Sequence, residues 1–231
     1  MERDASFRKG KFISFEGVDG VGKTTHIRLL ADYLRSRGVE VITTREPGGT
    51  NIGVQLRSVL LHSRTIMCPS TELALMFADR AQHIEEKLLP ALQEGKWVLT
   101  DRYIDSAEAY QGGGRKLGSR IVLILHKILC KNLFPDLTVL LISDVKATLS
   151  RARRRNLRSQ VENGDESRFE NEDDAFHVRV LRTFLSIAKR EPKRVVTVDA
   201  ADPITKVHKK IVGIVNERLF SEKPLSKPKT P

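Results

Sequence analysis

Residues 17–24 carry a glycine-rich motif that strongly constrains the fold. They read Gly-x-x-x-x-Gly-Lys-Thr, the pattern of a phosphate-binding loop, or P-loop. An apolar strand pattern at residues 11–16 precedes the motif, and an amphipathic helix pattern follows it. In this context backbone N–H groups surround an anion at a helix N-terminus. The motif therefore predicts an α/β domain that binds a phosphorylated ligand.

Two side chains of the motif suit a nucleoside triphosphate. Lys23 can neutralise the β- and γ-phosphates, and the Thr24 hydroxyl can ligate Mg²⁺. We expect the Lys23 side chain to be solvated rather than part of the core. The apolar segment 97–100 ends at Asp101, and an aspartate at this place in P-loop enzymes binds Mg²⁺ directly or through water. These residues form a candidate site for a Mg²⁺-bound nucleotide.

Strand and helix patterns alternate along the chain, which predicts a parallel sheet with helices on both faces. The expected strands are 11–16, 39–44, 97–100, 137–142 and 194–198. The expected helices are 22–37, 51–62, 71–94, 103–110, 118–132, 145–155, 173–190 and 204–220. Pro90 should bend or break its helix near the end. We expect one domain at 1–220 and a disordered, basic tail at 221–231.

The net charge of +11 is compatible with two kinds of anionic partner. Much of it comes from a cluster formed by Arg151, Arg153, Arg154, Arg155 and Arg158. Clustered arginines near a P-loop suit a triphosphate, and no basic stretch is interleaved with base-stacking aromatic residues. We therefore expect no nucleic-acid partner, although a P-loop module that binds DNA stays an alternative interpretation.

The sequence also favours a cytoplasmic protein without a membrane partner. No apolar run approaches the ~20 residues of a membrane span. The first residues lack the apolar segment of a signal peptide. Cys68 and Cys130 have no metal-ligand spacing, and we expect both to be buried thiols in a reducing compartment.

Two arginines stand where a substrate could bind. Arg102 follows Asp101 at the carboxyl end of a strand, where ligands of open α/β sheets bind. The alternative is a surface ion pair with Asp101 or Asp79. Arg80 lies in an expected helix and, judged alone, would be a surface arginine. The turn at 45–50 either is a plain Pro-Gly-Gly turn or presents free N–H groups to a substrate.

Six motifs occur in a fixed order along the chain. They are Gly-Val-Asp-Gly-Val-Gly-Lys-Thr-Thr at 17–25, Arg-Glu-Pro-Gly-Gly-Thr at 45–50, Phe-Ala-Asp-Arg-Ala-Gln-His at 77–83, Asp-Arg-Tyr to Ala-Tyr-Gln-Gly at 101–112, Arg-Phe-Glu at 168–170 and Val-Asp-Ala at 198–200. Together they resemble the bacterial thymidylate kinases, P-loop enzymes of the nucleoside monophosphate kinase family. The resemblance runs from about residue 11 to 220.

This resemblance implies a three-layer P-loop kinase fold with a five-stranded parallel sheet and a mobile lid at about 151–170. It implies transfer of the γ-phosphoryl group of ATP to dTMP, giving dTDP and ADP for dTTP biosynthesis. It also implies Mg²⁺ as a cofactor and a homodimer.

The resemblance further assigns groups of residues. The ATP-binding group is Gly17, Val18, Asp19, Gly20, Val21, Gly22, Lys23, Thr24 and Thr25. The dTMP-binding group is Asp19, Glu46, Pro47, Arg57, Met76, Phe77, Arg80, Arg102, Ser106, Tyr110 and Gln111. The catalytic group is Asp19, Lys23, Arg102, Arg153 and Arg158. The Mg²⁺ ligands are Thr24 and Asp101.

Several of these residues resemble family residues of defined role. Asp19 resembles the carboxylate that faces the deoxyribose, and Arg102 the clamp on the dTMP phosphate. Arg80 resembles the arginine that hydrogen-bonds thymine. Tyr110 resembles the wall that disfavours a ribose 2′-hydroxyl, and Gln111 is expected to lie along the base.

Two positions near the expected base site differ from the family pattern. Met76 stands where a stacking phenylalanine is usual. Ala107 stands where a polar residue often contacts thymine N3, so that hydrogen bond must come from Ser106, Gln111 or water. A kinase for another nucleotide or for a nucleoside is therefore a second interpretation.

The lid also has features of its own. Gly20 occupies the P-loop position where eukaryotic relatives carry an arginine, and in the bacterial type lid arginines supply that charge. The cluster at 151–158 fits this place. The segment 156–167 is longer than usual, and Ser167 replaces the aspartate expected before Arg-Phe-Glu.

Overall fold

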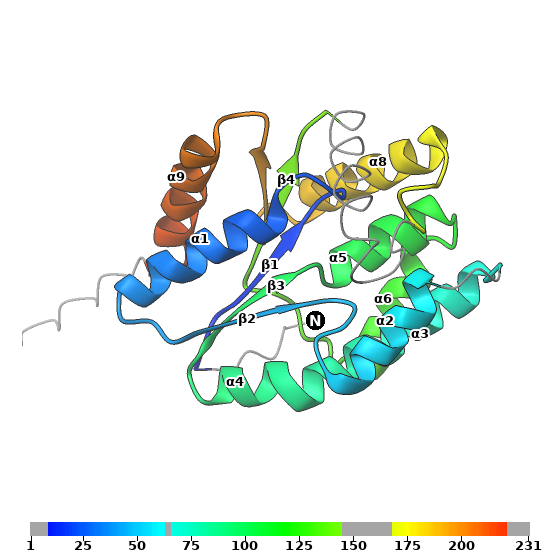
Figure 1. The fold of residues 1–231 in the computed structure, drawn as a ribbon, viewed down its shortest axis with the longest axis horizontal. Helices are drawn as coiled ribbons and strands as arrows, with labels where there is room; N and C mark the ends of the chain where they lie inside the picture. The colour runs from blue at the N-terminus through cyan, green and yellow to red at the C-terminus, as the bar shows by residue number, and fades with distance from the viewer. Residues whose placement is uncertain (1–8, 63–65, 145–167, 221–231) are drawn as a thin grey trace, which may run out of the picture.

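The computed structural model describes residues 9–62, 66–144 and 168–220. Within these ranges, five parallel strands form one sheet in the order β2-β3-β1-β4-β5 (Figure 1). The strands are β1 (Phe12–Glu16), β2 (Val41–Arg45), β3 (Trp97–Asp101), β4 (Leu137–Ile142) and β5 (Val195–Asp199). The predicted five-stranded parallel sheet is confirmed, with strand ends that differ by at most two residues.

Helices connect the strands. They are α1 (Lys23–Ser36), α2 (Asn51–His62), α3 (Pro69–His83), α4 (Leu89–Gln93), α5 (Ile104–Ala107), α6 (Ser119–Leu129), α8 (Asp174–Arg190) and α9 (Ile204–Val215). The π-helical segments η1 (Ile84–Leu88), η2 (Glu108–Gly114) and η3 (Asn216–Phe220) continue α3, α5 and α9. Pro90 lies in the first turn of α4, where its missing N–H group costs little. The helix that was expected at 71–94 is interrupted by the π-helical segment η1, which directly precedes α4.

Three expected features lie outside the described residues. They are the helix 145–155, most of the lid at 151–170, and the tail 221–231.

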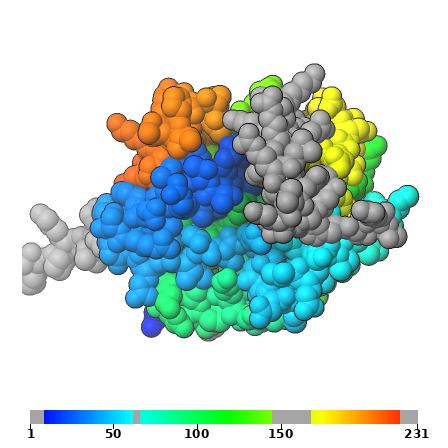
Figure 2. All heavy atoms as spheres, in the orientation of Figure 1, coloured from blue at the N-terminus to red at the C-terminus, as the bar shows by residue number. Residues whose placement is uncertain are grey.

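The core lies on both faces of the sheet, because side chains alternate along each strand. Ile13 and Phe15 of β1 pack with α1 and α9, which lie side by side in Figures 1 and 2. Phe12 of β1 and Val98 of β3 pack instead with α3, α4, α5 and α6. The alternation directs Glu16 to the same face as Phe12, toward α5.

The carboxyl ends of three neighbouring strands supply the parts of the candidate site. β1 leads into the P-loop, β2 into Glu46, and β3 into Arg102. Parallel strands end at a common edge, so these segments meet although they are distant in sequence.

The structure bears on two expectations, which concern membrane-spanning segments and the burial of the cysteines. Across the described residues, every helix is too short or too polar to cross a bilayer. Cys130 is buried as expected, whereas Cys68 is exposed at the start of α3, so the prediction of two buried thiols is wrong for Cys68.

Candidate active site

The P-loop turns tightly between β1 and α1. Gly17, Gly20 and Gly22 have φ angles of 131°, 80° and 106°, in the region that favours glycine. A Cβ atom on Gly17 would lie 2.4 Å from the Leu141 carbonyl oxygen. Gly22 caps α1 without a side-chain hydrogen bond, which leaves the first N–H groups of the helix available to an anion.

Lys23 is folded back across the loop and is only 6% exposed. Its Nζ atom donates to two P-loop carbonyl oxygens at 3.1 and 3.2 Å. It lies 3.9 Å from Asp19 and 4.0 Å from Asp101. Burial and the Arg102 charge lower the pKa of Lys23, while both carboxylates oppose this. The expectation of a solvated lysine is wrong, because the loop's own carbonyl groups enclose the ammonium.

Thr24 and Asp101, the predicted metal ligands, lie together. The Thr24 hydroxyl donates to Asp101 Oδ2 over 2.9 Å. A hydroxyl and a carboxylate are oxygen ligands of the kind that Mg²⁺ prefers. Within the described part of the chain, no cluster of three or more His, Cys, Asp or Glu side chains could hold a metal by itself.

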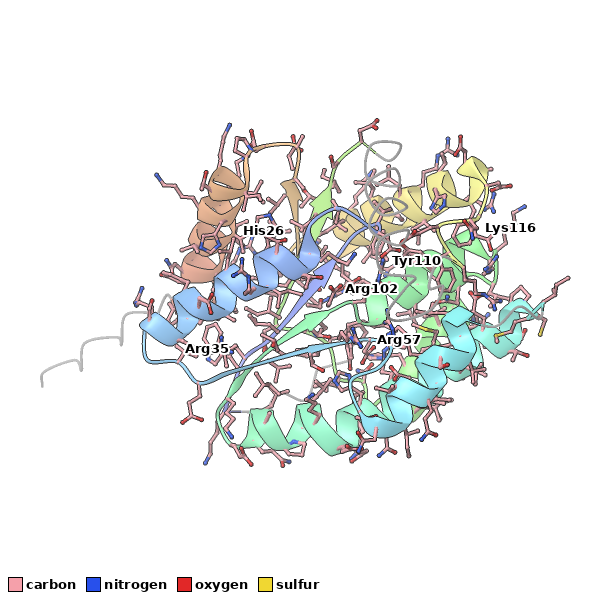
Figure 3. The ribbon with its side chains drawn as sticks, in the orientation of Figure 1. His26, Arg35, Arg57, Arg102, Tyr110 and Lys116 are labelled. Carbon is pink, nitrogen blue, oxygen red and sulfur yellow. The ribbon has the colours of Figure 1, made fainter. Side chains whose placement is uncertain are left out.

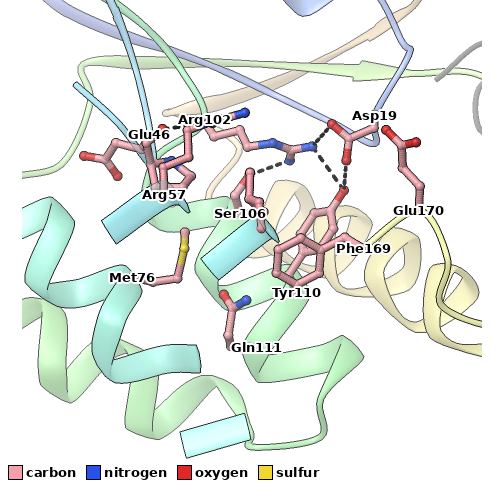
Figure 4. Close-up of a pocket in the computed structure, with 12 residues that line it drawn as sticks. Asp19, Glu46, Arg57, Met76, Arg102, Ser106, Tyr110, Gln111, Phe169 and Glu170 are labelled. Atoms are coloured by element: carbon pink, nitrogen blue, oxygen red, sulfur yellow. Dashed lines mark hydrogen bonds and ion pairs between the residues drawn. The ribbon is translucent and has the colours of Figure 1, made fainter. Parts of the chain in front are cut away.

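A pocket opens beside the P-loop at this edge of the sheet (Figure 4). Nine of the eleven residues predicted to bind substrate line it: Asp19, Glu46, Pro47, Arg57, Met76, Arg102, Ser106, Tyr110 and Gln111. Leu61, Phe169 and Glu170 also line it and were not predicted. The Arg-Phe-Glu motif was a signal for the last two, whereas nothing in the sequence distinguishes Leu61 from an ordinary apolar helix position.

Arg102 connects the pocket with the P-loop. Its φ angle of 68° is unusual for a residue other than glycine. Figure 3 shows its side chain near Tyr110 and Arg57, in the middle of the molecule. Its guanidinium donates to Asp19 Oδ1 at 2.6 Å, Gly17 O at 3.1 Å, Ser106 Oγ at 3.0 Å and Tyr110 Oη at 3.2 Å. Its ion-pair partner is therefore Asp19, rather than Asp101 or Asp79 as in the alternative interpretation.

Beneath Arg102 lies a buried carboxylate that the sequence analysis missed. Glu16 accepts hydrogen bonds from the Tyr103 N–H group at 2.8 Å and from the Ser106 hydroxyl at 2.5 Å. Because Ser106 Oγ also accepts from Arg102, Glu16 supports the guanidinium through Ser106. Burial and Asp105 raise the pKa of Glu16 to about 7. The available signal was an acidic residue that ends an apolar strand directly before the P-loop.

Arg80 and Phe77 lie behind the pocket rather than in it, and both are fully buried. Arg80 donates to Glu46 Oε2 at 2.8 Å and to the Tyr103 carbonyl oxygen at 3.0 Å. Phe77 packs in the core, with its ring centre 5.0 Å from the Arg80 guanidinium carbon. In this structure neither side chain is part of the pocket lining, so their contact with substrate stays a prediction. A surface position for Arg80 is wrong, because the side chain is fully buried.

Glu46 is a pocket residue held by buried partners. Besides Arg80, its carboxylate contacts His83 Nδ1 at 2.9 Å. Burial opposes ionisation, but Arg80 and His83 outweigh it and hold the pKa of Glu46 below its usual value. On the same loop, the Pro47 carbonyl oxygen accepts from Arg57 Nη1 at 2.9 Å. The loop after β2 thus holds one carboxylate and one arginine at the pocket.

Tyr110 lies between Arg102 and Phe169, which is near the end of the predicted lid. Its ring centre lies 4.9 Å from the Arg102 guanidinium carbon and 5.5 Å from the Phe169 ring, which it meets edge to face. Burial raises the pKa of the Tyr110 phenol, so it stays neutral at physiological pH.

A buried polar cluster around Glu72 of α3 contacts Gln111, which lines the pocket. The Gln111 amide nitrogen donates to Glu72 Oε1 over 2.9 Å. Arg115 and Arg168 both pair with Glu72 Oε2, at 3.0 and 3.4 Å. Glu72 therefore links Gln111 of the pocket lining to Arg168, near the end of the predicted lid.

The remaining predicted residues divide into two groups. The Val18 and Val21 side chains are buried in the core, which leaves only their backbone groups for a phosphate, and Thr25 follows in the first turn of α1. Arg153 and Arg158 lie outside the described residues.

A phosphate loop and an arginine-lined pocket that share Asp19 and Arg102 define a P-loop phosphotransferase, which moves a phosphoryl group between two bound molecules. The sequence profile of the family described as thymidylate kinase matches residues 15–211. The chain belongs to the thymidylate kinase family.

Individual relatives agree with this assignment. The chain is 44% identical over 210 residues to a thymidylate kinase of Nitrosomonas eutropha, covering 91% of this chain and 94% of the relative. It is 45% identical over 208 residues to one of Pelobacter propionicus, covering 89% and 94%. The crystal structure of thymidylate kinase from Ehrlichia chaffeensis matches with a TM-score of 0.71 at 30% identity, covering 90% of this chain and 98% of that one.

Proposed function

We propose that this chain transfers the γ-phosphoryl group of ATP to the phosphate of dTMP, giving dTDP and ADP. The observation that carries the proposal is the Asp19–Arg102 pair, which joins the ATP phosphate loop to the acceptor pocket. The product serves dTTP biosynthesis, and we propose a cytoplasmic location for the enzyme.

The proposed reaction is a direct in-line displacement. The acceptor phosphate has a second pKa of about 6 and is largely dianionic at neutral pH, so a strong general base is unnecessary. The enzyme's contribution is positioning and charge neutralisation. In the proposed reaction Lys23 exchanges its P-loop carbonyl partners for the donor phosphates, and Arg102 exchanges part of its bonding with Asp19 for the acceptor phosphate.

The same pocket accounts for the choice of a deoxynucleotide. Asp19 and Tyr110 both line it, and we propose that Asp19 faces the sugar with Tyr110 beside it. The Ser106 oxygen already accepts from Arg102 and its proton is donated to Glu16, so Ser106 is a poor acceptor for thymine N3–H. We assign the hydrogen bond from thymine N3–H to Gln111 Oε1, which is buried and has no hydrogen-bond partner among the described residues.

Thr24 and Asp101 fit a Mg²⁺ ion bound together with ATP. Their oxygens lie 2.9 Å apart beside the P-loop, with ATP phosphate oxygens and water expected as the other ligands. When bound, the ion would neutralise charge on the β- and γ-phosphates.

A second copy of the chain is the proposed partner of α6. Ile121, Ile124 and Ile128 lie at helical spacing and are 40%, 41% and 69% exposed. α6 packs beside α3, which packs beside α2, where further apolar side chains are exposed. Light scattering coupled to size exclusion should give a dimer for the natural chain and a monomer for Ile124→Lys/Ile128→Glu. A natural chain that stays monomeric at high concentration contradicts this proposal.

Phosphate transfer measured side by side with different acceptors tests the proposed activity. We expect turnover with ATP and dTMP, with lower efficiency for dUMP and none for dGMP or thymidine. Preferred turnover of thymidine or a purine nucleotide would favour the second interpretation. DNA binding that weakens with salt, without dTMP turnover, would favour a nucleic-acid-binding module.

A further inference from the structure

We propose that Glu72 sets the base selectivity of the acceptor pocket by fixing which end of the Gln111 side-chain amide faces the base. The inference rests on the proposed function. Glu72 does not line the pocket, but it contacts Gln111, which does. It is a positioning residue, because it acts through Gln111.

The contacts of Glu72 determine the orientation of the amide. Its Oε2 atom pairs with Arg115 Nη2 at 3.0 Å and with Arg168 at 3.4 Å. Its Oε1 atom accepts from the Gln111 amide nitrogen at 2.9 Å and from Arg115 Nε at 3.1 Å. A carboxylate paired with two arginines only accepts hydrogen bonds. The amide group that faces Glu72 must therefore be the NH₂ donor. The amide oxygen is left for the other side.

The Gln111 amide lies at the pocket. Figure 4 shows the Gln111 amide pointing into the space between Met76 and Tyr110, with Ser106 nearby. Gln111 is 1% exposed, and its Oε1 atom has no hydrogen-bond partner among the described residues. A buried acceptor without a donor is unfavourable until a ligand supplies one.

The chemistry of the bases makes this orientation selective. Thymine and uracil carry an N3–H donor, which completes the bond to Gln111 Oε1. Cytosine has a lone pair at N3, so two acceptors would face each other. Ala107 has no polar side-chain group, and the Arg80 guanidinium has only donors, so neither can accept a hydrogen bond from N3–H.

The test compares dTMP with 5-methyl-dCMP, which differs only at N3 and C4 of the base. In the Glu72→Gln variant, the new amide oxygen can keep Arg115 Nη2 and Arg168, while the NH₂ group faces Gln111 and gives up the hydrogen bond from Arg115 Nε. The Gln111 amide should turn over and present its NH₂ group to the base. We expect the ratio of kcat/KM for dTMP to that for 5-methyl-dCMP to fall by about tenfold or more.

Two further variants isolate the cause. Gln111→Ala removes the contact with the base and should lower the ratio to a similar extent. Arg168→Gln removes one partner of Glu72 but keeps its bond to Gln111, so the ratio should stay within about twofold of the natural enzyme whatever happens to turnover.

Each outcome is decisive. A Glu72→Gln enzyme that keeps its selectivity while Gln111→Ala loses it overturns the role of Glu72. Selectivity retained in both variants overturns the Gln111 contact as well. Absence of dTMP turnover in the natural enzyme instead refutes the proposed function. If Glu72→Gln does not fold, neutron diffraction of the natural enzyme with dTMP shows which atom of the Gln111 amide carries the hydrogens. An Nε2 atom that faces the base overturns the proposal.

Discussion

The Arg102 Nη2 atom lies 2.6 Å from Asp19 Oδ1, and this ion pair joins the acceptor pocket to the P-loop. Asp19 follows β1 and Arg102 follows β3, and these strands pair in parallel with Phe15 opposite Asp101. The two residues therefore meet although they are 83 positions apart. Burial opposes the charge, but Asp19 and Tyr110 outweigh it and raise the pKa of Arg102. A permanently charged guanidinium is thus held where we propose that the acceptor phosphate binds.

Replacing Arg102 with alanine should impair the acceptor side. We expect kcat/KM for dTMP to fall about a hundredfold or more, because a forked arginine–phosphate contact is among the strongest hydrogen-bonding arrangements. KM for ATP should change little. Arg102→Lys keeps the charge but not the fork and should recover only part of the loss. Steady-state kinetics with each substrate varied would contradict this if ATP affinity fell and dTMP affinity did not.

Replacing Lys23 with alanine should impair the donor side. We expect turnover to fall by at least about a hundredfold, because the ammonium offsets charge on the β- and γ-phosphates. Since Lys23 is buried and bonded to P-loop carbonyl groups, some thermal stability should also be lost. A melting curve run beside the kinetics separates the two effects. A folded variant with more than about a tenth of the natural activity would show that the phosphates are neutralised elsewhere.

The lid arginines stay a prediction from the sequence. Gly20 has no side chain to offer the transferring group, so Arg153 and Arg158 are expected to supply positive charge. Alanine at either position should lower turnover about 10³-fold, as for other arginines that contact transition-state charge. Alanine at Arg151, Arg154 or Arg155 should change turnover by less than about threefold, as for exposed ion pairs. If replacing all five leaves turnover unchanged, the lid has no catalytic role.

Hydrophobic periodicity and the motifs were enough to predict the sheet and most of the pocket. The five strands are apolar runs, and Asp19, Arg102, Tyr110 and Gln111 stand at motif positions next to strand or helix ends. Such positions depend on local sequence, and parallel topology then brings them to one edge.

What escaped prediction depends on contacts between distant segments. Met76 and Phe77 are adjacent on α3, and successive helical residues point about 100° apart, so one lines the pocket and the other enters the core. Periodicity could not choose between them. Glu16 and Glu72 were missed because their partners come from other elements of the fold.

Gly113 should be essential for the packing of η2 against α8. A Cβ atom at this position would lie 2.0 Å from Thr183 Oγ1, and one at Gly114 would lie 2.5 Å from the Phe176 ring. Gly113→Ala should therefore cost about 1–3 kcal/mol of unfolding free energy. KM for dTMP should rise too, because Tyr110 and Gln111 belong to the same segment.

Urea unfolding measures this cost, and a second substitution tests its cause. Thr183→Ala removes the hydroxyl that the new methyl group would meet, so the double variant should regain part of the lost stability. Equal stability of Gly113→Ala and the natural enzyme would mean that α8 can move away freely.

Glu16 should make stability depend on pH. Its pKa rises from the ordinary 4.5 to about 7 in the folded enzyme, so the folded state binds this proton more tightly than the unfolded state does. Burial and Asp105 cause the rise, against Ser106, Arg102 and the Tyr103 N–H group. The stabilising contribution is therefore complete below pH 4.5 and is lost as pH rises through about 7.

The Glu16→Gln variant removes this titration while keeping the shape of the protonated acid. The unfolding free energy of this variant minus that of the natural enzyme should increase between about pH 5 and 8, by on the order of 3 kcal/mol. Asp79→Asn is a matched comparison at a separate buried carboxyl, whose pKa of about 6 places the corresponding change at lower pH. Urea unfolding of the three proteins across this range measures both transitions. A constant difference between Glu16→Gln and the natural enzyme would mean that Glu16 titrates as it does in the unfolded chain, and that water or a cation compensates its charge in the folded enzyme.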